Sequence, residues 1–497
     1  MKSPFPTPRP RISVRPNWSC KVTHPLILAL LLGLITSECL AQASPTAPDT
    51  ASGPGAPAAS TASAASDTSK TALTAAAAPA ASTTTSGPPF PTPPTKVTPE
   101  LATVPEGLPP GAQEENSNFD YVSWETFVAL NWPATAKGCS PDLTKTILSG
   151  TGPVVWETYL ADTDVFKSKP APWCGGPPGM SGVSADAQKL GQKTGVTRFF
   201  GMLSKFSPTL STSTGVKGIQ EVGGALTDKN GRFVRYEIRM NQDEYNYIVK
   251  NNLWNKAGQA GKTISFPEGQ SSYGPVGAME IKAAWKVLGA GDDPKKFYNI
   301  QAIVFNNSSG AKSPGTNPVT LGLVGLHILH KAKGQSKWLW STFEQNDNLT
   351  SFSYPNGKPN VQTAKTPYTE LDPKTGKPLN LPVNVVRVNP IENPATEMNA
   401  GYQKLLAGSV WANYSLVATQ WAGNLGGMPK PAFMANTVIE TYTQGPTPPS
   451  DGPIPYPSPG YQPFSPKASS SCMKCHSVAK DAQNANGDFS FLLGNAK

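Results

Sequence analysis

The distribution of apolar and polar residues predicts a chain dominated by strands. Charged and apolar residues alternate through residues 232–239, which is the pattern of a strand with one buried face. Runs rich in β-branched, aromatic and leucine residues predict further strands at residues 263–266, 278–287, 298–305, 319–330, 338–343 and 383–388, with weaker matches at 409–419 and 437–442.

Two segments instead show apolar residues at helical spacing. In residues 118–132, Tyr121, Trp124 and Phe127 recur at intervals of three positions. Asn241 is a suitable N-cap for a second helix that directly follows the strand at residues 232–239. Because strands outnumber helices and do not alternate strictly with them, we expect an α+β fold with a β-rich, mostly antiparallel sheet.

The first 43 residues have the layout of an export signal. A basic region is followed by an eleven-residue apolar run at residues 25–35, and then by the small-residue sequence Ala41-Gln42-Ala43. The apolar run is short for a bilayer span. We expect residues 1–43 to be a signal peptide that directs the protein to the periplasm or the medium. An uncleaved anchor is the alternative, and it would be the only contact with a membrane.

Two other stretches have compositions that cannot form a core. Residues 44–117 are mostly Ala, Ser, Thr, Pro and Gly, which predicts a disordered spacer. Residues 444–470 are rich in proline, which predicts an extended linker. Between these two stretches, residues 118–443 are expected to form the globular domain.

The basic charge of the chain does not indicate a nucleic-acid partner. The formal net charge is +9, and removal of the predicted signal peptide lowers it to about +5. Lys and Arg are scattered and form no block, so nucleic acid is not expected to bind. A mild positive excess suits an acidic partner protein, and it is also what an ordinary solvated surface carries.

Cysteine usage leaves one pair for a disulfide. Of the six cysteines, two lie in the predicted signal peptide and two lie close together near the C-terminus. The remaining Cys139 and Cys174 form an even pair in a chain that is expected to reach an oxidising compartment. This pattern favours a disulfide between them, with two free thiols as the alternative.

The strongest chemical signal is the sequence Cys472-Met473-Lys474-Cys475-His476. Two cysteines three positions apart, followed at once by histidine, match the C-x-x-C-H attachment site for covalent haem. Each thiol can form a thioether with one porphyrin vinyl group, and the histidine can then bind the iron. In these few residues the chain resembles c-type cytochromes. The resemblance implies one haem c per chain, attached at Cys472 and Cys475, with His476 as the proximal iron ligand.

Residues 471–497 are expected to form a haem-attachment segment that docks on the domain. Only 21 residues follow His476, which is too few to enclose a haem. A zinc site, a redox dithiol and a structural disulfide are the other uses of paired cysteines. A zinc site requires four ligands, and the sequence offers no second cysteine pair nearby. The abundance of strands does not match a four-helix cytochrome bundle.

A sixth iron ligand is expected to come from the domain. His327 and His330 lie in the predicted strand 319–330, and their spacing sends the two side chains to opposite faces. We expect His327 to be the ligand because it lies deeper in the apolar run, with His330 as the alternative. Met428 and Met434 represent the competing ligand type. The other role open to either histidine is that of a buried neutral side chain bonded to a carbonyl group.

Carboxylates give weaker indications. Glu280 lies in a predicted strand and Glu344 directly follows another, and either could act as an acid–base group, although a solvated strand face is the commoner role. The chain has no nucleophile elbow, phosphate-binding loop or zinc-protease motif.

Together these patterns predict an exported monohaem c-type cytochrome that carries electrons through a haem docked on a β-rich domain. Two alternatives stay open. One is a haem enzyme, a peroxidase or an oxygenase, with an open distal site. The other is a binding protein in which the haem is an accessory. Neither the redox partner protein nor a substrate can be named from these residues.

Overall fold

The fold is taken from a computed structural model that describes most of the chain beyond residue 90. The predicted signal peptide, most of the predicted spacer, most of the candidate strand at 383–388 and the predicted linker at 444–470 lie outside the described residues. The structure describes residues 91–149, 152–174, 185–200, 226–228, 230–305, 317–335, 337–348, 368–370, 387, 391–422, 434–440, 472–477 and 479–497.

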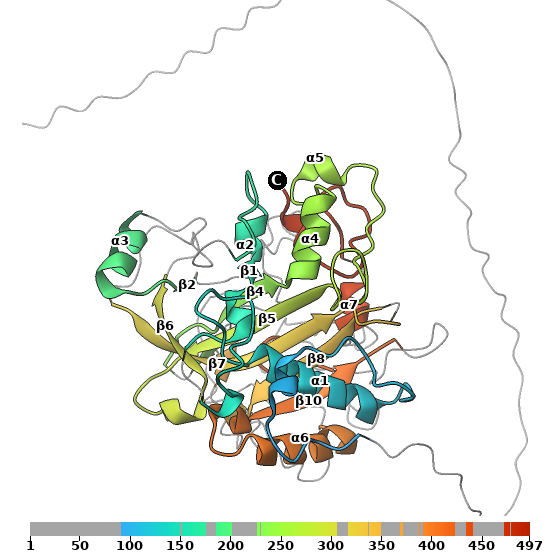
Figure 1. Cartoon of the computed structure of the whole chain (residues 1–497). Helices are drawn as coiled ribbons and strands as arrows, with labels where there is room; N and C mark the ends of the chain where they lie inside the picture. Colours follow the sequence, from blue (N-terminus) through green and yellow to red (C-terminus); the bar gives the residue numbers. More distant parts are fainter. Residues whose placement is uncertain are drawn as a thin grey trace, which may run out of the picture. The chain divides into compact units, whose positions relative to one another are not determined.

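One mostly antiparallel sheet forms the centre of the fold (Figure 1). Its strands, within the described residues, are β1 (Leu160–Ala161), β2 (Phe199–Phe200), β4 (Arg235–Met240), β5 (Met279–Val287), β6 (Asn299–Val304), β7 (Val319–His330), β8 (Leu339–Gln345) and β10 (Tyr414–Gln420). A separate antiparallel pair joins β3 (Leu226–Asp228) and β9 (Tyr368–Glu370). Among the described strands of the large sheet, only β2 and β6 pair in parallel, so the predicted α+β class with a mostly antiparallel sheet is confirmed.

β7 is the central strand, as its sequence requires. It pairs with β5 along one edge, and along the other edge with β6 and then with β8. All of its residues except the first two are buried. A strand that is apolar on both faces must be covered on both, and a central position in a sheet between helices and loops provides this cover.

Helices and turns cover the two faces of the sheet. The α-helices of the described residues are α1 (Asn116–Leu130), α2 (Asp162–Val165), α3 (Ala185–Thr194), α4 (Gln242–Lys250), α5 (Lys256–Gln259), α6 (Asn393–Leu405) and α7 (Cys472–His476). Short 3-10 turns lie at Pro99–Ala102, Ile147–Ser149, Val155–Thr158, Pro294–Lys296, Asn346–Asn348, Val410–Asn413 and Leu492–Asn495. In Figure 1, α1 and α6 lie on one side of the sheet, and α4, α5 and the C-terminus lie on the other.

The predictions for the long elements are confirmed. The helix predicted at 118–132 is α1, and the Asn241 side chain caps α4 by accepting a hydrogen bond from the Glu244 N–H. The strands predicted at 232–239, 278–287, 298–305, 319–330 and 338–343 are β4, β5, β6, β7 and β8, with boundaries shifted by a few residues at most. In the weaker match at 409–419, a 3-10 turn precedes β10.

Two predicted strands are wrong because side chains, not a neighbouring strand, bond their backbones. Residues 263–266 form no strand: the N–H of Ser265 donates to the Tyr247 hydroxyl (2.9 Å), and the N–H of Phe266 donates to Asp488 (2.7 Å). The described part of 437–442 is a turn, in which Thr437 N–H donates to Glu344 (2.6 Å). Both segments bury apolar side chains, which explains why their sequences look like strands.

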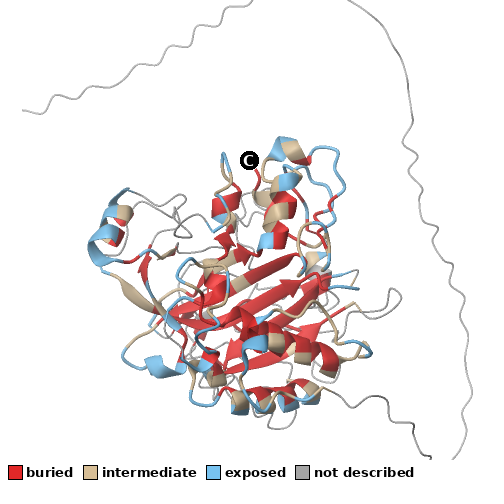
Figure 2. Cartoon of the chain, in the orientation of Figure 1, coloured by how far each residue is buried: buried red, intermediate tan, exposed pale blue. Residues whose placement is uncertain are grey.

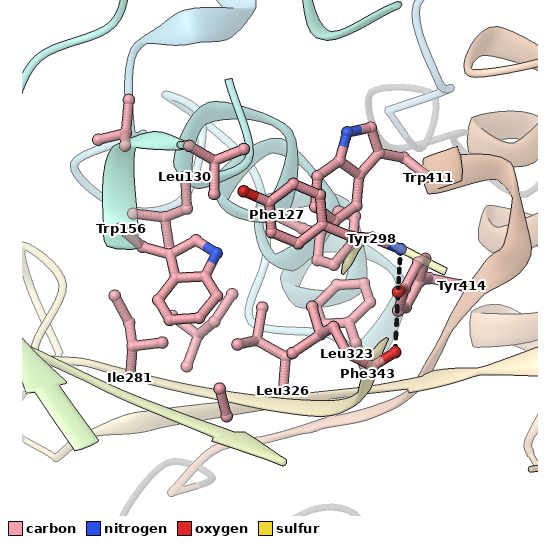
Figure 3. Close-up of a cluster of buried hydrophobic side chains, with 14 of the residues drawn as sticks. Phe127, Leu130, Trp156, Ile281, Tyr298, Leu323, Leu326, Phe343, Trp411 and Tyr414 are labelled. Atoms are coloured by element: carbon pink, nitrogen blue, oxygen red, sulfur yellow. Dashed lines mark hydrogen bonds between the residues drawn. The ribbon is translucent and has the colours of Figure 1, made fainter. Parts of the chain in front are cut away.

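The larger core lies between the sheet and α1 with α6 (Figures 2 and 3). Figure 3 shows Phe127 of α1 over Phe343 and Leu326 of the sheet, with the Phe127 and Phe343 ring centroids 4.3 Å apart. The buried Tyr414 hydroxyl accepts from the Tyr298 N–H (3.0 Å) and donates to the Leu323 carbonyl (2.9 Å). Aromatic packing and satisfied polar groups therefore make this face a rigid support.

The end of the predicted spacer belongs to the fold. Leu101 and Ala102 are buried in the large core, and the Glu106 carbonyl accepts a hydrogen bond from the Lys333 N–H (2.7 Å). The expectation that the whole of residues 44–117 is a disordered spacer is therefore wrong for its last part. Scattered apolar residues in this part find a place on the domain, although the average composition of the stretch would not form a core by itself.

The cysteine prediction is confirmed: Cys139 and Cys174 form a disulfide, with their Cα atoms 6.2 Å apart. Such a bond is consistent with an oxidising compartment outside the cytoplasm. Within the ranges that the structure describes, no helix has the length and apolar character needed to cross a membrane.

Candidate functional site

The C-x-x-C-H motif forms one turn of helix, α7. Residues three and four apart lie on the same side of an α-helix, so Cys472, Cys475 and His476 share one side of this turn. The side chain of Cys472 is buried. The side chain of Cys475 lies outside the described part of the structure. The backbone thus places two thiol-bearing residues and an imidazole where one ligand group could engage all three.

His476 is held in a defined tautomer. Its Nδ1 donates a hydrogen bond to the carbonyl oxygen of Phe489 at 2.7 Å, which leaves Nε2 as the ring nitrogen that could bind a metal. Burial lowers the pKa of His476 to about 4, so the ring is neutral, which is the form that binds metals. A histidine whose other ring nitrogen is bonded to a backbone carbonyl is the common arrangement of a metal ligand.

The carbonyl that orients His476 lies in an unusual turn. Asp488 and Phe489 are consecutive residues with positive φ, at 48° and 67°. This left-handed conformation is unfavourable for residues other than glycine, and above all for a bulky one, unless surrounding contacts enforce it. Here the contacts are those of Asp488, whose carboxylate pairs with the Lys331 ammonium (2.6 Å) and whose carbonyl accepts from Trp338 Nε1 (2.8 Å).

Aromatic rings enclose the imidazole. Its centroid lies 5.6 Å from the Trp340 ring and 5.0 Å from the Phe491 ring, both in edge contacts. Trp340, on β8, also lies 6.0 Å from Phe489. The β8 strand and the C-terminal tail therefore form two walls around His476.

The tail after α7 is anchored to α4 and α5. Leu492 and Leu493 are buried in the second apolar cluster, on the side of the sheet away from α1. The side-chain amide of Gln259 donates to the Leu493 carbonyl (3.0 Å) and accepts from the Ala482 N–H (2.8 Å). The start of α7 is fixed as well, because Met473 N–H donates to Gln420 on β10 (2.8 Å). The described residues of α7 and of the tail therefore pack against α5 and β10.

The two histidines of β7 point to opposite faces, as their spacing predicts. His330 lies opposite Met279 and Leu339, and its Nε2 donates to the Val276 carbonyl (2.8 Å). Burial lowers the pKa of His330 to about 4. His330 is thus a buried neutral histidine bonded to a carbonyl, on the face away from α7.

His327 lies on the face that carries α7. It is buried and directly opposite Lys282 in the β5–β7 pair, and its Nε2 donates to the Glu440 carboxylate at 2.9 Å. The charges of Lys282, Glu440 and His327 act on His476. His327 therefore lies on the same face of the sheet as α7, and its charge acts on His476. Ligation of iron through Nε2 of His327 would break its bond to Glu440.

Of the two methionines, only one can be placed. Met434 is buried in the same apolar cluster as Cys472 and Met473. Met428 lies outside the described residues.

The two carboxylates of the strands are buried, so the expected solvated strand face is wrong for both. Glu344 accepts hydrogen bonds from the Thr437 N–H (2.6 Å) and hydroxyl (2.5 Å) and pairs with Arg387, which gives it a structural role. Glu280 faces Glu244 of α4. Burial raises the pKa of Glu280 to about 7. The pKa of Glu244 is raised well above its ordinary value by burial and by the charge of Glu280.

Sequence patterns alone could not have found Glu244 as a partner of Glu280. Asn241 and Glu244 have the spacing of a capping box, in which the glutamate would bond back to the N-cap backbone. Instead, the N–H of Asn241 donates to the Met279 carbonyl at 3.0 Å, which frees the Glu244 side chain to turn inward.

The residues of α7 fit a covalent haem by their donor chemistry: two cysteines and a neutral imidazole lie on one helical turn, with Nδ1 already bonded. Over the described ranges, no group of three or more His, Cys, Asp and Glu side chains could hold a metal ion by itself. Comparison with known protein families, with curated proteins and with solved structures gives no match for this chain. The functional argument therefore depends on the residues and contacts described above.

Proposed function

We propose that this protein is an exported monohaem c-type cytochrome that transfers electrons through a haem attached at Cys472 and Cys475. The single observation that carries the proposal is the bond from His476 Nδ1 to the Phe489 carbonyl, within a C-x-x-C-H turn that is packed on the domain. This bond presents Nε2 as a ligand, and a merely structural histidine would not require the adjoining cysteine pair.

Residues of this chain would supply the environment of the haem. A bound haem supplies one-electron chemistry, because its iron alternates between the ferric and ferrous states. His476 would bind the iron through Nε2, and the Phe489 carbonyl would hold the ring in place and raise its basicity. Trp340 and Phe491 limit the access of water to this histidine, and a dry surrounding shifts the reduction potential.

His327 is the residue that we propose as the sixth ligand. It lies on the same face of the sheet as α7, and its field acts on His476. His330 serves as a matched control, because it lies in the same strand, is equally buried and points to the other face. Two nitrogen ligands would leave no open position for a substrate, which favours electron transfer over an enzyme.

The optical spectrum tests this proposal. We expect the ferrous protein to show a six-coordinate, low-spin spectrum that carbon monoxide does not alter. His327→Ala should convert the ferric protein to high spin, whereas His330→Ala should not. Rapid binding of carbon monoxide to the unmodified protein would instead favour a haem enzyme with an open distal site. No change of spin state in either variant would exclude both histidines and leave methionine, with Met434 first, or no ligand.

A further inference from the structure

The buried carboxyl pair of Glu244 and Glu280 is not used by the function proposed above. Glu244 is fully buried and Glu280 is 6% exposed. If both groups were ionised, both oxygens of Glu244 and one oxygen of Glu280 would have no hydrogen-bond donor among the described residues. Two carboxyl groups that face each other can satisfy these oxygens only by holding a proton between them, because an ionised carboxylate cannot donate.

The pair is in contact with the segment that holds His476. The hydroxyl of Ser490, which is fully buried, bonds to the Glu280 carboxyl. Ser490 directly follows Phe489, whose carbonyl accepts the proton of His476 Nδ1. A short chain of bonds therefore connects Glu280 to the imidazole. Lys282 adds a second connection, because its charge acts on both Glu280 and His476.

Charged groups on two other elements act on the pair. Lys282 on β5 lowers the pKa of Glu280, and Asp162 on α2 raises it. Asp162 is partly exposed, and burial raises its pKa to about 6. The groups that act on Asp162 in turn are Asp164, Arg239 and Glu237. Asp162 also lies against the tail, since the side-chain amide of Asn495 donates to it at 3.4 Å.

We propose that Glu244 and Glu280 form a proton-storing carboxyl pair that takes up one proton from water when the haem iron accepts one electron. This inference rests on the proposed function. One electron passes from a reduced donor protein to ferric iron, which becomes ferrous. The pair passes from one bound proton to two, and no bond to the iron changes. The negative charge of the electron is thereby balanced by a proton that binds the buried pair inside the same protein.

The reduction potential should depend on pH because the carboxyl pair binds its second proton more tightly in the reduced protein than in the oxidised protein. Below about pH 7 both glutamates are protonated in either redox state, so the potential is independent of pH. Above this pH the pair of the oxidised protein has lost one proton, while the added negative charge lets the reduced protein keep it. The reduction potential should therefore fall with pH in this window, by at most 59 mV for each tenfold change in proton concentration.

Potentiometric titration of the holoprotein tests the coupling. We expect the reduction potential of the wild type to fall as the pH rises above about 7. The double variant Glu244→Gln/Glu280→Gln, which keeps the shape and removes both acids, should lose this pH dependence. Glu397→Gln removes the same charge from an exposed position on α6, across the sheet, and should keep it. A wild-type potential independent of pH, or a slope that survives in the double variant, would overturn the proposal.

Infrared spectroscopy provides a readout that does not depend on the haem. The wild type at neutral pH should show the stretch of a protonated carboxyl group that is missing from the double variant Glu244→Gln/Glu280→Gln. If this band is present in all variants alike, no shared proton exists and the proposal is wrong. If the band behaves as expected but the protein carries no covalent haem, the proposed function and the coupling both fail. If the protein carries covalent haem but its reduction potential does not change with pH, the proton coupling is wrong and the proposed function stands.

Discussion

Asp488 is the residue at which the docking of the C-terminal segment can be tested most sharply. Its carboxylate accepts from the Lys331 ammonium (2.6 Å) and from the Phe266 N–H (2.7 Å), and it lies next to the carbonyl that holds His476. Replacement by asparagine keeps the size of the side chain and the tolerance for positive φ, but removes the charge. The variant Asp488→Asn therefore isolates the ion pair.

The expected loss in the free energy of unfolding depends on how deeply Lys331 is buried. The Lys331 side chain is 4% exposed, and the Asp488 side chain is 14% exposed. A hydrogen bond to a charged group contributes roughly 1.5–3 kcal/mol. Removal of one partner of a buried ion pair costs roughly 3–5 kcal/mol, because the remaining charge stays buried. Since asparagine can still accept one of the two bonds, we expect Asp488→Asn to lower the free energy of unfolding by about 2–4 kcal/mol.

A matched control is available in the exposed pair of Lys296 and Asp347, whose side chains are 48% and 50% exposed. Asp347→Asn removes the same kind of charge and should cost less than about 1 kcal/mol. Urea denaturation followed by circular dichroism measures both variants by linear extrapolation. Equal and small changes in both would contradict the reasoning, because they would mean that the segment after α7 does not unfold together with the sheet.

Three further outcomes are expected. Deletion of residues 44–90 should leave the melting temperature within about a degree or two, because their composition cannot supply a core. Extending the deletion through Leu101 should destabilise the domain by roughly 2 kcal/mol or more, as differential scanning calorimetry would show. Replacing Cys139 and Cys174 by serine opens a loop with a sequence separation of 35 and should cost about 4 kcal/mol in urea denaturation under oxidising conditions. Because the pKa of His330 is lowered to about 4 in the folded protein, wild-type stability should fall relative to His330→Gln as the pH drops from about 6.5 to about 4, by roughly 3 kcal/mol in parallel urea titrations.

The sequence patterns predict well those helices and strands whose own residues determine which side chains are buried. β7 is apolar on both faces, and α1 has aromatic residues at helical spacing, so each pattern leads to one structure. Residues 263–266 show the opposite case. Their backbone is bonded by Tyr247 and by Asp488, and Asp488 is 222 positions from Phe266, so no local pattern reveals that a strand is unnecessary.

The residues of the candidate site can be identified in the sequence, but their surroundings cannot. The spacing of Cys472, Cys475 and His476 is visible in the sequence, and the division of His327 and His330 between two faces follows from strand geometry. The Phe489 carbonyl that orients His476 depends on two consecutive residues with positive φ, and neither is glycine. Sequence reasoning expects such a turn only where glycine or asparagine occurs, and therefore misses it.

The central claim is that the C-x-x-C-H turn carries covalent haem, and it is tested by denaturing electrophoresis stained for haem on protein exported by cells that mature c-type cytochromes. The account predicts a stained band for the wild type, a strongly weakened band for Cys472→Ala or Cys475→Ala, and none for the double variant. The disulfide variant Cys139→Ser/Cys174→Ser, which also removes two cysteines, should stain like the wild type. An unstained wild type, or undiminished staining in the Cys472→Ala/Cys475→Ala protein, would contradict the account.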